Sequence, residues 1–204
     1  MQINKSSEQV DRIVDLARRK GLIGIRDLRE AGISHELLYY LQGRGVLERV
    51  GRGLYKLPDT SLGEHLTLAM VAKRIPDAVV CLLSALSFHG LTTQLPNKVW
   101  IARPFGQRPR HLEYPPIHVI HIQPDLHNRN IEEHDREGVL IKVYNPARTV
   151  VDCFKFRSKV GLDVAIEALR EAWRSRVVTM DELREIAMEH RMNKVMQPYL
   201  EAIV

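Results

Sequence analysis

One stretch, residues 21–57, constrains the fold of this chain more than any other part. It reads GLIGIRDLREAGISHELLYYLQGRGVLERVGRGLYKL, in which two short helical patterns precede two short strand patterns. The first pattern predicts a helix over Ile25–Ala31, with Ile25 and Leu28 on one face. Gly32 ends this helix, because a residue without a Cβ easily adopts the left-handed turn that follows a helix.

The second helical pattern begins after Ser34 and continues to about Gln42. The side-chain oxygen of Ser34 is predicted to cap free backbone N–H groups at the start of this helix. Leucines form its core side, at positions 37, 38 and 41. The residues nearer to solvent are His35, Glu36, Tyr39 and Gln42.

A basic hairpin follows this second helix. Val46–Val50 and Leu54–Leu57 alternate as strands around Gly51-Arg52-Gly53, which is a tight-turn signal. Helix, turn, helix and hairpin is the plan of a winged helix-turn-helix, whose second helix enters the major groove while the wing touches phosphates. The cations in and beside the wing are Arg44, Arg49, Arg52 and Lys56, and nearby glycines allow close approach to a phosphate. The alternatives are an ordinary basic surface loop, or a winged helix that contacts only protein.

The distribution of charge supports a polyanionic partner. The chain of 204 residues has a net charge of +5, and residues 1–58 hold eleven Lys and Arg against seven Asp and Glu.

Cys81 and Cys153 are far apart in apolar sequence, which favours buried thiols in a reducing cytosol over a disulfide. No apolar run approaches the roughly 20 residues that cross a bilayer, and no signal peptide is evident, so we expect a cytoplasmic protein without a membrane partner.

The remainder of the chain predicts a second, mixed domain. The turn-rich segment Leu57–Ser61 marks the boundary, giving domains 1–58 and 59–204. Branched apolar runs predict three strands, at Val99–Ala102, Ile117–Ile122 and Val139–Tyr144. Helical patterns cover Leu62–Arg74, Val79–His89, Pro146–Phe156, Leu162–Ser175, Met180–His190 and Met192–Ile203. The expected fold class is α+β: an N-terminal winged helix-turn-helix, then a small β-sheet and a C-terminal helical bundle.

Local signals refine the helical part. Asn145 precedes Pro146 and is predicted to cap a helix. Thr179 and Glu182 have the spacing of a capping box. Arg148 and Asp152 are four residues apart on one predicted helix, so they are expected to form a local, structural ion pair.

Other candidate sites are weaker. A loop with Arg103, Arg108 and Arg110 is a possible second basic contact, or simply a solvated loop. His118 and His121 would point to opposite faces of a strand, so we expect no metal site. Pro124-Asp125 followed by Leu140-Ile141-Lys142 is weakly similar to the sequence pattern of metal-dependent nucleases, which has two carboxylates and a lysine. Leu140 occupies the position of the second carboxylate. We therefore expect no catalytic residue and no cofactor.

The layout as a whole resembles the AbiEi-type antitoxins of type IV (abortive-infection) toxin–antitoxin systems, over nearly the whole chain. The resemblance rests on three segments: GVLERVGRGLY at 45–55, SALSFHGL at 84–91 and RTVVD at 148–152. The first of these is the most typical of the family. The predicted second helix carries neither Arg nor Lys, where members of the family often have several.

The resemblance implies a winged helix that binds operator DNA and represses the protein's own promoter. It also implies a C-terminal domain that counteracts a nucleotidyltransferase-like toxin without a tight complex. The wing residues that match the family pattern are Arg49, Arg52, Tyr55 and Arg44.

The helical pattern, the basic hairpin and the family resemblance together predict which residues bind DNA. We expect His35, Tyr39 and Gln42 to face base edges and the basic residues to contact phosphates. The full set is Ser34, His35, Tyr39, Gln42, Arg44, Arg49, Arg52, Tyr55 and Lys56. Two other functions are left open: a nuclease-like enzyme that the winged helix targets to nucleic acid, and a winged-helix adaptor for another protein.

Overall fold

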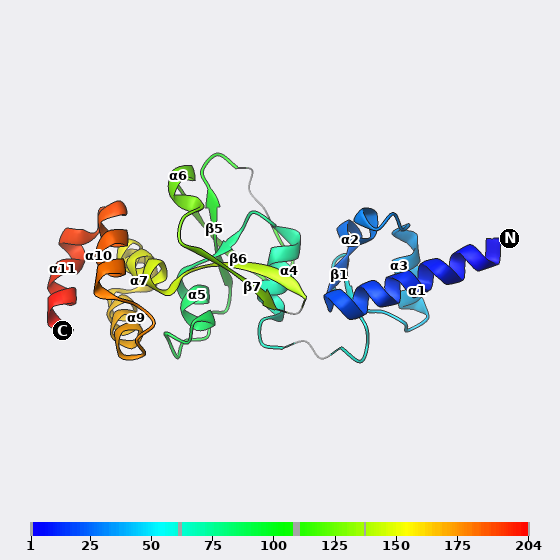
Figure 1. The fold of residues 1–204 in the computed structure, drawn as a ribbon, viewed down its shortest axis with the longest axis horizontal. Helices are drawn as coiled ribbons and strands as arrows, with labels where there is room; N and C mark the ends of the chain where they lie inside the picture. Colours follow the sequence, from blue (N-terminus) through cyan, green and yellow to red (C-terminus); the bar gives the residue numbers. More distant parts are fainter. Residues whose placement is uncertain (1, 61–62, 108–110, 137, 204) are drawn as a thin grey trace. The chain divides into compact units, whose positions relative to one another are not determined.

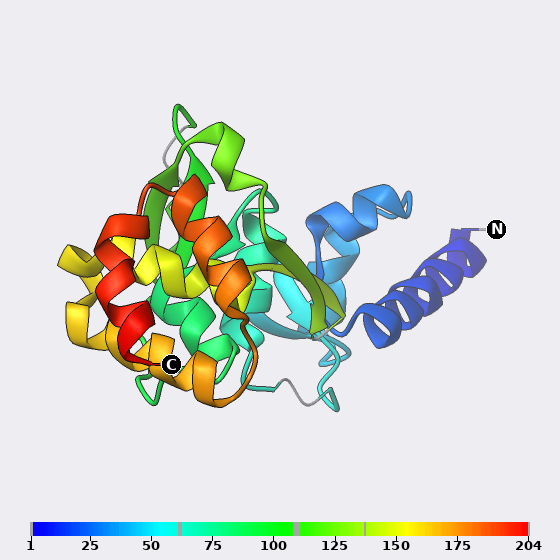
Figure 2. The same cartoon turned by 60° about the vertical axis from the view of Figure 1, so that its left-hand side comes forward.

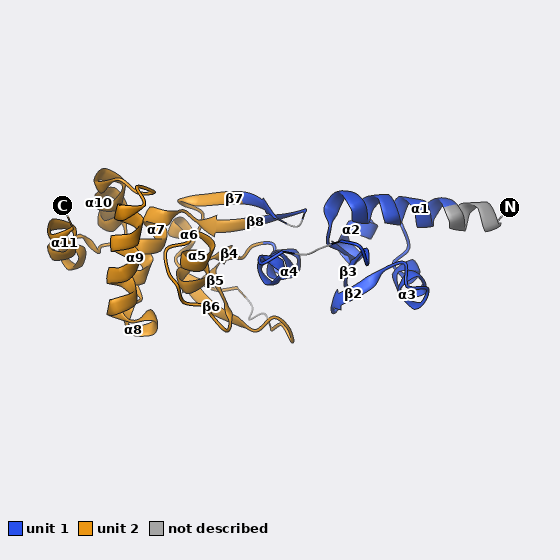
Figure 3. Ribbon diagram, turned by 90° about the horizontal axis from the view of Figure 1, so that it is seen from below, with its two compact units in different colours: residues 1–76, 134–141 blue, residues 77–133, 142–204 orange. Residues whose placement is uncertain are grey.

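A computed structural model describes residues 2–60, 63–107, 111–136 and 138–203. The chain forms two compact units, coloured blue and orange in Figure 3. The first comprises Met1–Pro76 with His134–Ile141, and the second comprises Asp77–Glu133 with Lys142–Val204. Helices and two small sheets make up the described residues, which confirms the α+β class.

The first unit contains a small sheet and four helices within residues 2–76. Its helices are α1 (Gln2–Lys20), α2 (Ile25–Glu30), α3 (Glu36–Gly43) and α4 (Leu66–Arg74). Its strands are β1 (Ile23–Gly24), β2 (Glu48–Gly51) and β3 (Leu54–Lys56), in the order β1-β3-β2 with antiparallel pairing. The helix, turn, helix and hairpin predicted from the sequence are confirmed, and together they form a winged helix-turn-helix (Figure 1).

The core of the winged helix comes from the apolar side of each helix. Leu28, Leu38 and Leu41 are almost fully buried, whereas Ile25 is 37% exposed, so only Leu28 of the first predicted pair faces the core. Gly32 adopts a φ of +68°, and the following residue, Ile33, donates its N–H to the carbonyl of Leu28 at 2.9 Å. This pattern closes α2 as expected.

The start of α3 differs from the prediction. The helix begins at Glu36, and His35 precedes it without a side-chain cap. The Ser34 hydroxyl accepts a hydrogen bond from the N–H of Glu36 at a long distance, 3.4 Å. Ser34 therefore lies one position further from the helix than a capping residue does.

A five-stranded sheet in the order β6-β5-β4-β8-β7 forms the centre of the second unit, and the outer ends of β7 and β8 belong to the first unit. The strands are β4 (Val79–Val80), β5 (Val99–Pro104), β6 (Ile117–Ile122), β7 (Ile131–Arg136) and β8 (Val139–Tyr144). β4 pairs antiparallel with β5, while β4–β8 and β5–β6 are parallel pairs. The three predicted strands are confirmed. Because Val79–Val80 joins the sheet, the predicted helix at 79–89 begins only at Leu82.

The helices of the second unit pack around α7, as the first two views show (Figure 1, Figure 2). They are α5 (Leu82–Phe88), α6 (Pro124–His127), α7 (Pro146–Lys155), α8 (Arg157–Val160), α9 (Leu162–Arg174), α10 (Met180–Glu189) and α11 (Asn193–Ala202). Both predicted caps are confirmed. The side chain of Asn145 accepts from the N–H of Arg148 at 2.9 Å, and Thr179 and Glu182 form a reciprocal capping box.

A buried ion pair holds the middle of this bundle. Arg148 Nε lies 2.8 Å from Asp152 Oδ2, and the two side chains are 0% and 1% exposed. The Arg148 guanidinium also lies over the Tyr144 ring at 4.5 Å and donates to the carbonyl of Leu126 at 3.3 Å. The pair predicted from spacing alone is thus structural. Among the described residues, no helix is long and apolar enough to cross a membrane.

Candidate nucleic-acid interface

The outer face of α3 presents polar and aromatic side chains. Ser34, His35 and Tyr39 are exposed, Tyr39 by 61%, and Gln42 is half-buried. Tyr40, which was not predicted from the sequence, is also exposed, by 49%, and follows Tyr39 in the chain. The aromatic pair lies between Leu38 and Leu41 of α3, so the same helical pattern could have identified it.

Arg44 lies at the end of α3 and is exposed. Its guanidinium carbon is 5.1 Å from the centre of the Tyr40 ring, which is a cation–π distance. This contact orients a cation where the helix meets the wing. A guanidinium donates bidentate hydrogen bonds to a phosphate, so Arg44 suits a backbone contact with DNA.

The wing is a hairpin with an irregular register. Arg49 pairs with Tyr55 and Gly51 with Leu54, and the register shifts between Arg49 and Gly51. Gly53 completes the turn with a φ of +69°, a conformation that few side chains tolerate. Arg49 and Arg52 are both exposed, and Arg49 Nε donates to the carbonyl of Gly51 at 3.2 Å. The wing therefore carries two guanidinium groups close to its turn.

Tyr55 does not belong to this surface. Its side chain is 1% exposed within the core of the winged helix, next to Leu38 and Leu41 in the same cluster. Burial raises the pKa of the Tyr55 phenol above its usual value. We therefore correct the expectation that Tyr55 contacts DNA, because a side chain in the core cannot reach a phosphate.

Lys56, which is predicted to contact a phosphate, forms an ion pair within the wing. Its ammonium lies 2.9 Å from Glu48 Oε2, and the side chain is 12% exposed. The same nitrogen donates to the carbonyls of Thr60 at 3.0 Å and Leu57 at 3.4 Å. Lys56 ties the wing to the segment that follows it.

The predicted second basic contact is not supported. Arg103 is only 3% exposed, and its guanidinium pairs with Asp77 Oδ2 at 2.8 Å and with the side-chain oxygen of Gln107. The antiparallel register of β4 and β5 brings Asp77 to Arg103, which the sequence alone does not reveal. Arg103 is therefore unable to meet a polyanion, and Arg108 and Arg110 lie outside the described residues.

The remaining candidates do not assemble into a metal or thiol site within the described part of the chain. No group of three or more His, Cys, Asp or Glu side chains there is arranged to hold a metal ion. His118 stacks on Trp100 with ring centres 4.0 Å apart. Cys81 and Cys153 are buried free thiols, and burial raises the pKa of both.

Comparisons with known proteins agree with this architecture. The crystal structure of RV2827C protein from Mycobacterium tuberculosis superimposes with a TM-score of 0.57, covering 89% of this chain and 71% of that one. At 15% identity, this likeness shows the fold alone. A search of curated proteins finds no match. Residues 11–58 match the family described as "Transcriptional regulator, AbiEi antitoxin", which confirms the resemblance over that segment. The segment holds the second half of α1 and the whole of the helix-turn-helix and wing.

Proposed function

We propose that this protein is a DNA-binding transcriptional autorepressor and the antitoxin of a type IV toxin–antitoxin system. One observation carries the proposal: a winged helix that matches AbiEi regulators exposes Arg44, Arg49 and Arg52 around α3. The three guanidinium groups suit phosphates. The exposed side chains of α3 suit base edges.

The division of roles follows from side-chain chemistry. His35 and Tyr39 stand on the exposed face of α3, where a recognition helix meets the major groove. Gln42 is half-buried and contributes a smaller part of the surface. Residues 34–43 contain no Lys or Arg, so attraction to phosphates falls to the arginines after the helix and in the wing.

The salt dependence of binding tests this division. Three phosphate contacts per protomer give a slope of about −2.7 in a plot of log affinity against log salt. Arg52→Ala removes one contact, so the slope becomes less steep by about 0.9 and affinity falls for every sequence. Arg170→Ala, an exposed arginine of α9, is the matched control and leaves the slope unchanged.

The assay is fluorescence anisotropy with labelled DNA from immediately upstream of the protein's own gene, against a scrambled duplex. We expect tight binding to the upstream DNA and weaker binding to the scrambled one. Tyr39→Ala should reduce this preference more than it reduces binding to the scrambled duplex. No binding to either duplex at low salt would favour the protein-adaptor function instead.

The antitoxin role concerns the neighbouring gene product. We propose that the second unit counteracts a nucleotidyltransferase-like toxin in the cytoplasm without forming a tight complex. Expression of the adjacent gene alone should stop growth, and co-expression of this chain should restore it. A variant lacking Arg49 and Arg52 should still restore growth, because those side chains belong to the DNA-binding surface. If the intact chain fails to restore growth, the antitoxin role is contradicted, while the proposed DNA binding is unaffected.

A further inference from the structure

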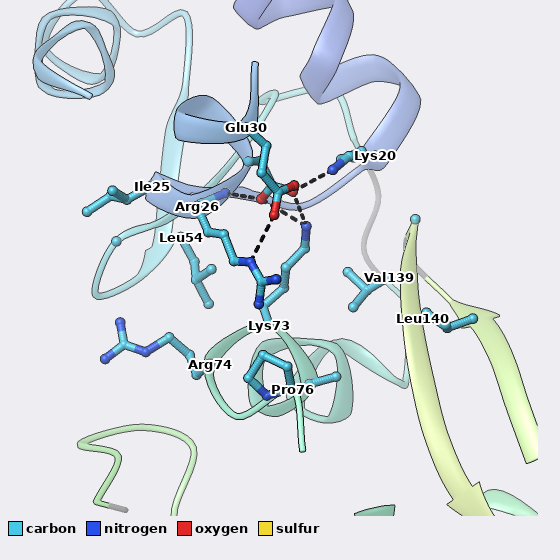
Figure 4. A pocket seen from close by; sticks show the side chains of 15 residues that line it. Lys20, Ile25, Arg26, Glu30, Leu54, Lys73, Arg74, Pro76, Val139 and Leu140 are labelled. Carbon is cyan, nitrogen blue, oxygen red and sulfur yellow. Dashed lines mark hydrogen bonds and ion pairs between the residues drawn. The ribbon is translucent and has the colours of Figure 1, made fainter. Parts of the chain in front are cut away.

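The first unit contains a cavity of about 420 Å³ that the DNA-binding surface does not use. Its walls come from α2, the turn of the wing, the end of α4 and residues 138–140 (Figure 4). Small-molecule sites in proteins have volumes of roughly 300–1,000 Å³. The cavity is therefore large enough for a compact ligand.

A cluster of charges on one wall has more cations than anions. The carboxylate of Asp27 accepts hydrogen bonds from Lys20 at 2.7 Å and from Lys73 at 2.8 and 2.9 Å. The Asp27 side chain is 6% exposed, and it also accepts from the N–H of Gly24. Burial alone would raise the pKa of Asp27, but the two lysines outweigh it and the pKa is lowered. One carboxylate thus balances two ammonium groups, which leaves one positive charge in surplus.

Arg74 adds a second surplus charge to the same cavity. Its guanidinium donates to the backbone carbonyl of Arg52, which is a neutral acceptor. The other arginine of the lining, Arg26, is balanced by Glu30, with Nε and Oε1 2.9 Å apart. The lining therefore carries a net charge of about +2 from its four cations and two carboxylates.

The rest of the wall is apolar. It is formed by Ile25, Leu54, Pro76, Val139 and Leu140. Ile25 is 37% exposed and Leu140 is 53% exposed, so both offer surface to a ligand. An apolar wall beside a few polar groups is the usual composition of a small-molecule site.

We propose that this cavity binds a small organic phosphate ester of the nucleoside monophosphate class. The phosphate dianion is held by Lys73 and Arg74, where it balances the two surplus charges. The nucleoside lies against the apolar wall. The site uses none of the side chains proposed to contact DNA, so binding is measurable without DNA, and its failure leaves the proposed function untouched.

Isothermal titration calorimetry on the full chain tests the site, with the four common nucleoside 5′-monophosphates, adenosine and inorganic phosphate as probes. We expect at least one monophosphate to bind at least about tenfold more tightly than adenosine or inorganic phosphate. No heat from any monophosphate at about 5 mM overturns the proposal. Equal affinity for inorganic phosphate overturns the assignment to an ester.

Two variants test the location. Arg74→Gln removes one surplus charge, and Leu140→Asp places a negative charge on the apolar wall without touching the wing. Each should weaken monophosphate binding at least about tenfold, while Arg170→Gln on α9 should not. Circular dichroism confirms that each variant is folded before titration. Unchanged affinity in both folded variants overturns the location of the site.

Discussion

The buried pair of Arg148 and Asp152 predicts a large and asymmetric response to substitution. Asp152→Leu leaves the Arg148 guanidinium in the bundle with the carbonyl of Leu126 and the face of Tyr144 as its partners among the described residues. Removing one partner of a buried pair costs about 3–5 kcal/mol, because the remaining charge is neither solvated nor paired. This loss is a large part of the 5–15 kcal/mol that is typical of a whole domain.

The chain offers a selective probe for this measurement. Its two tryptophans, Trp100 and Trp173, both lie in the second unit, so their fluorescence in urea follows that unit alone. With a slope of about 2 kcal/mol per molar urea, a loss of about 4 kcal/mol lowers the unfolding midpoint by about 2 M.

A double variant separates charge from packing. Burial raises the pKa of Asp152 and Arg148 acts against this, so removing both charges also removes a desolvation cost. Arg148→Leu combined with Asp152→Leu should recover most of the midpoint that Asp152→Leu loses. A single variant as stable as the wild type, or a double variant as unstable as the single one, would refute the reasoning.

Three further predictions concern pH and capping. Because the pKa of Asp27 is lowered on folding, its ionised carboxylate stabilises the folded protein above pH 3.8. This stabilisation is lost as the pH falls through the pKa of Asp27 in the folded state. Asp27→Asn should therefore flatten the acid dependence of stability followed by circular dichroism; an unchanged profile contradicts the role of the lysines. Burial lowers the pKa of His190 from 6.5 to about 3, so the folded protein holds this side chain neutral. The stabilisation from neutral His190 is therefore complete above pH 6.5 and declines below it, where the unfolded chain binds a proton. His190→Leu should reduce the loss of tryptophan-monitored stability between pH 7 and pH 5, and an equal loss would count against neutral burial. Thr179→Ala should cost about 0.5–2 kcal/mol in urea unfolding, whereas no cost would show that the capping box adds nothing.

The sequence predicts those elements whose patterns are local. Ile117–Ile122 and Val139–Tyr144 are strands with the predicted bounds, because both are runs of branched apolar residues with clear ends. β4 was missed because a strand of two residues, Val79–Val80, cannot be distinguished from the start of the apolar helix that follows. β7 was missed because Ile131–Arg136 is a mostly charged segment without apolar alternation.

Some residues of the candidate site were also predictable from local patterns, and others were not. The exposure of Tyr39 follows from helical spacing, and that of Arg44 from its position between Gly43, the last residue of α3, and Gly45. The burial of Tyr55 and the pairing of Arg103 cannot be predicted from local sequence patterns, because both depend on tertiary contacts. Tyr55 packs under helices that precede it in the chain, and Arg103 meets Asp77, 26 residues away. Charge near a glycine-rich turn thus indicates a basic surface without showing which side chains reach it.

Under the proposed function, the absence of Lys and Arg from residues 34–43 has a consequence for how the protein searches the chromosome. Random DNA retains a protein mainly through phosphate charge, and in the proposed interface this charge comes from Arg44, Arg49 and Arg52. Encounters with wrong sites should therefore be brief, and residence at the correct site should depend on aromatic and polar contacts in the groove. A regulator built this way would need few copies in each cell, because little of it is sequestered on irrelevant DNA.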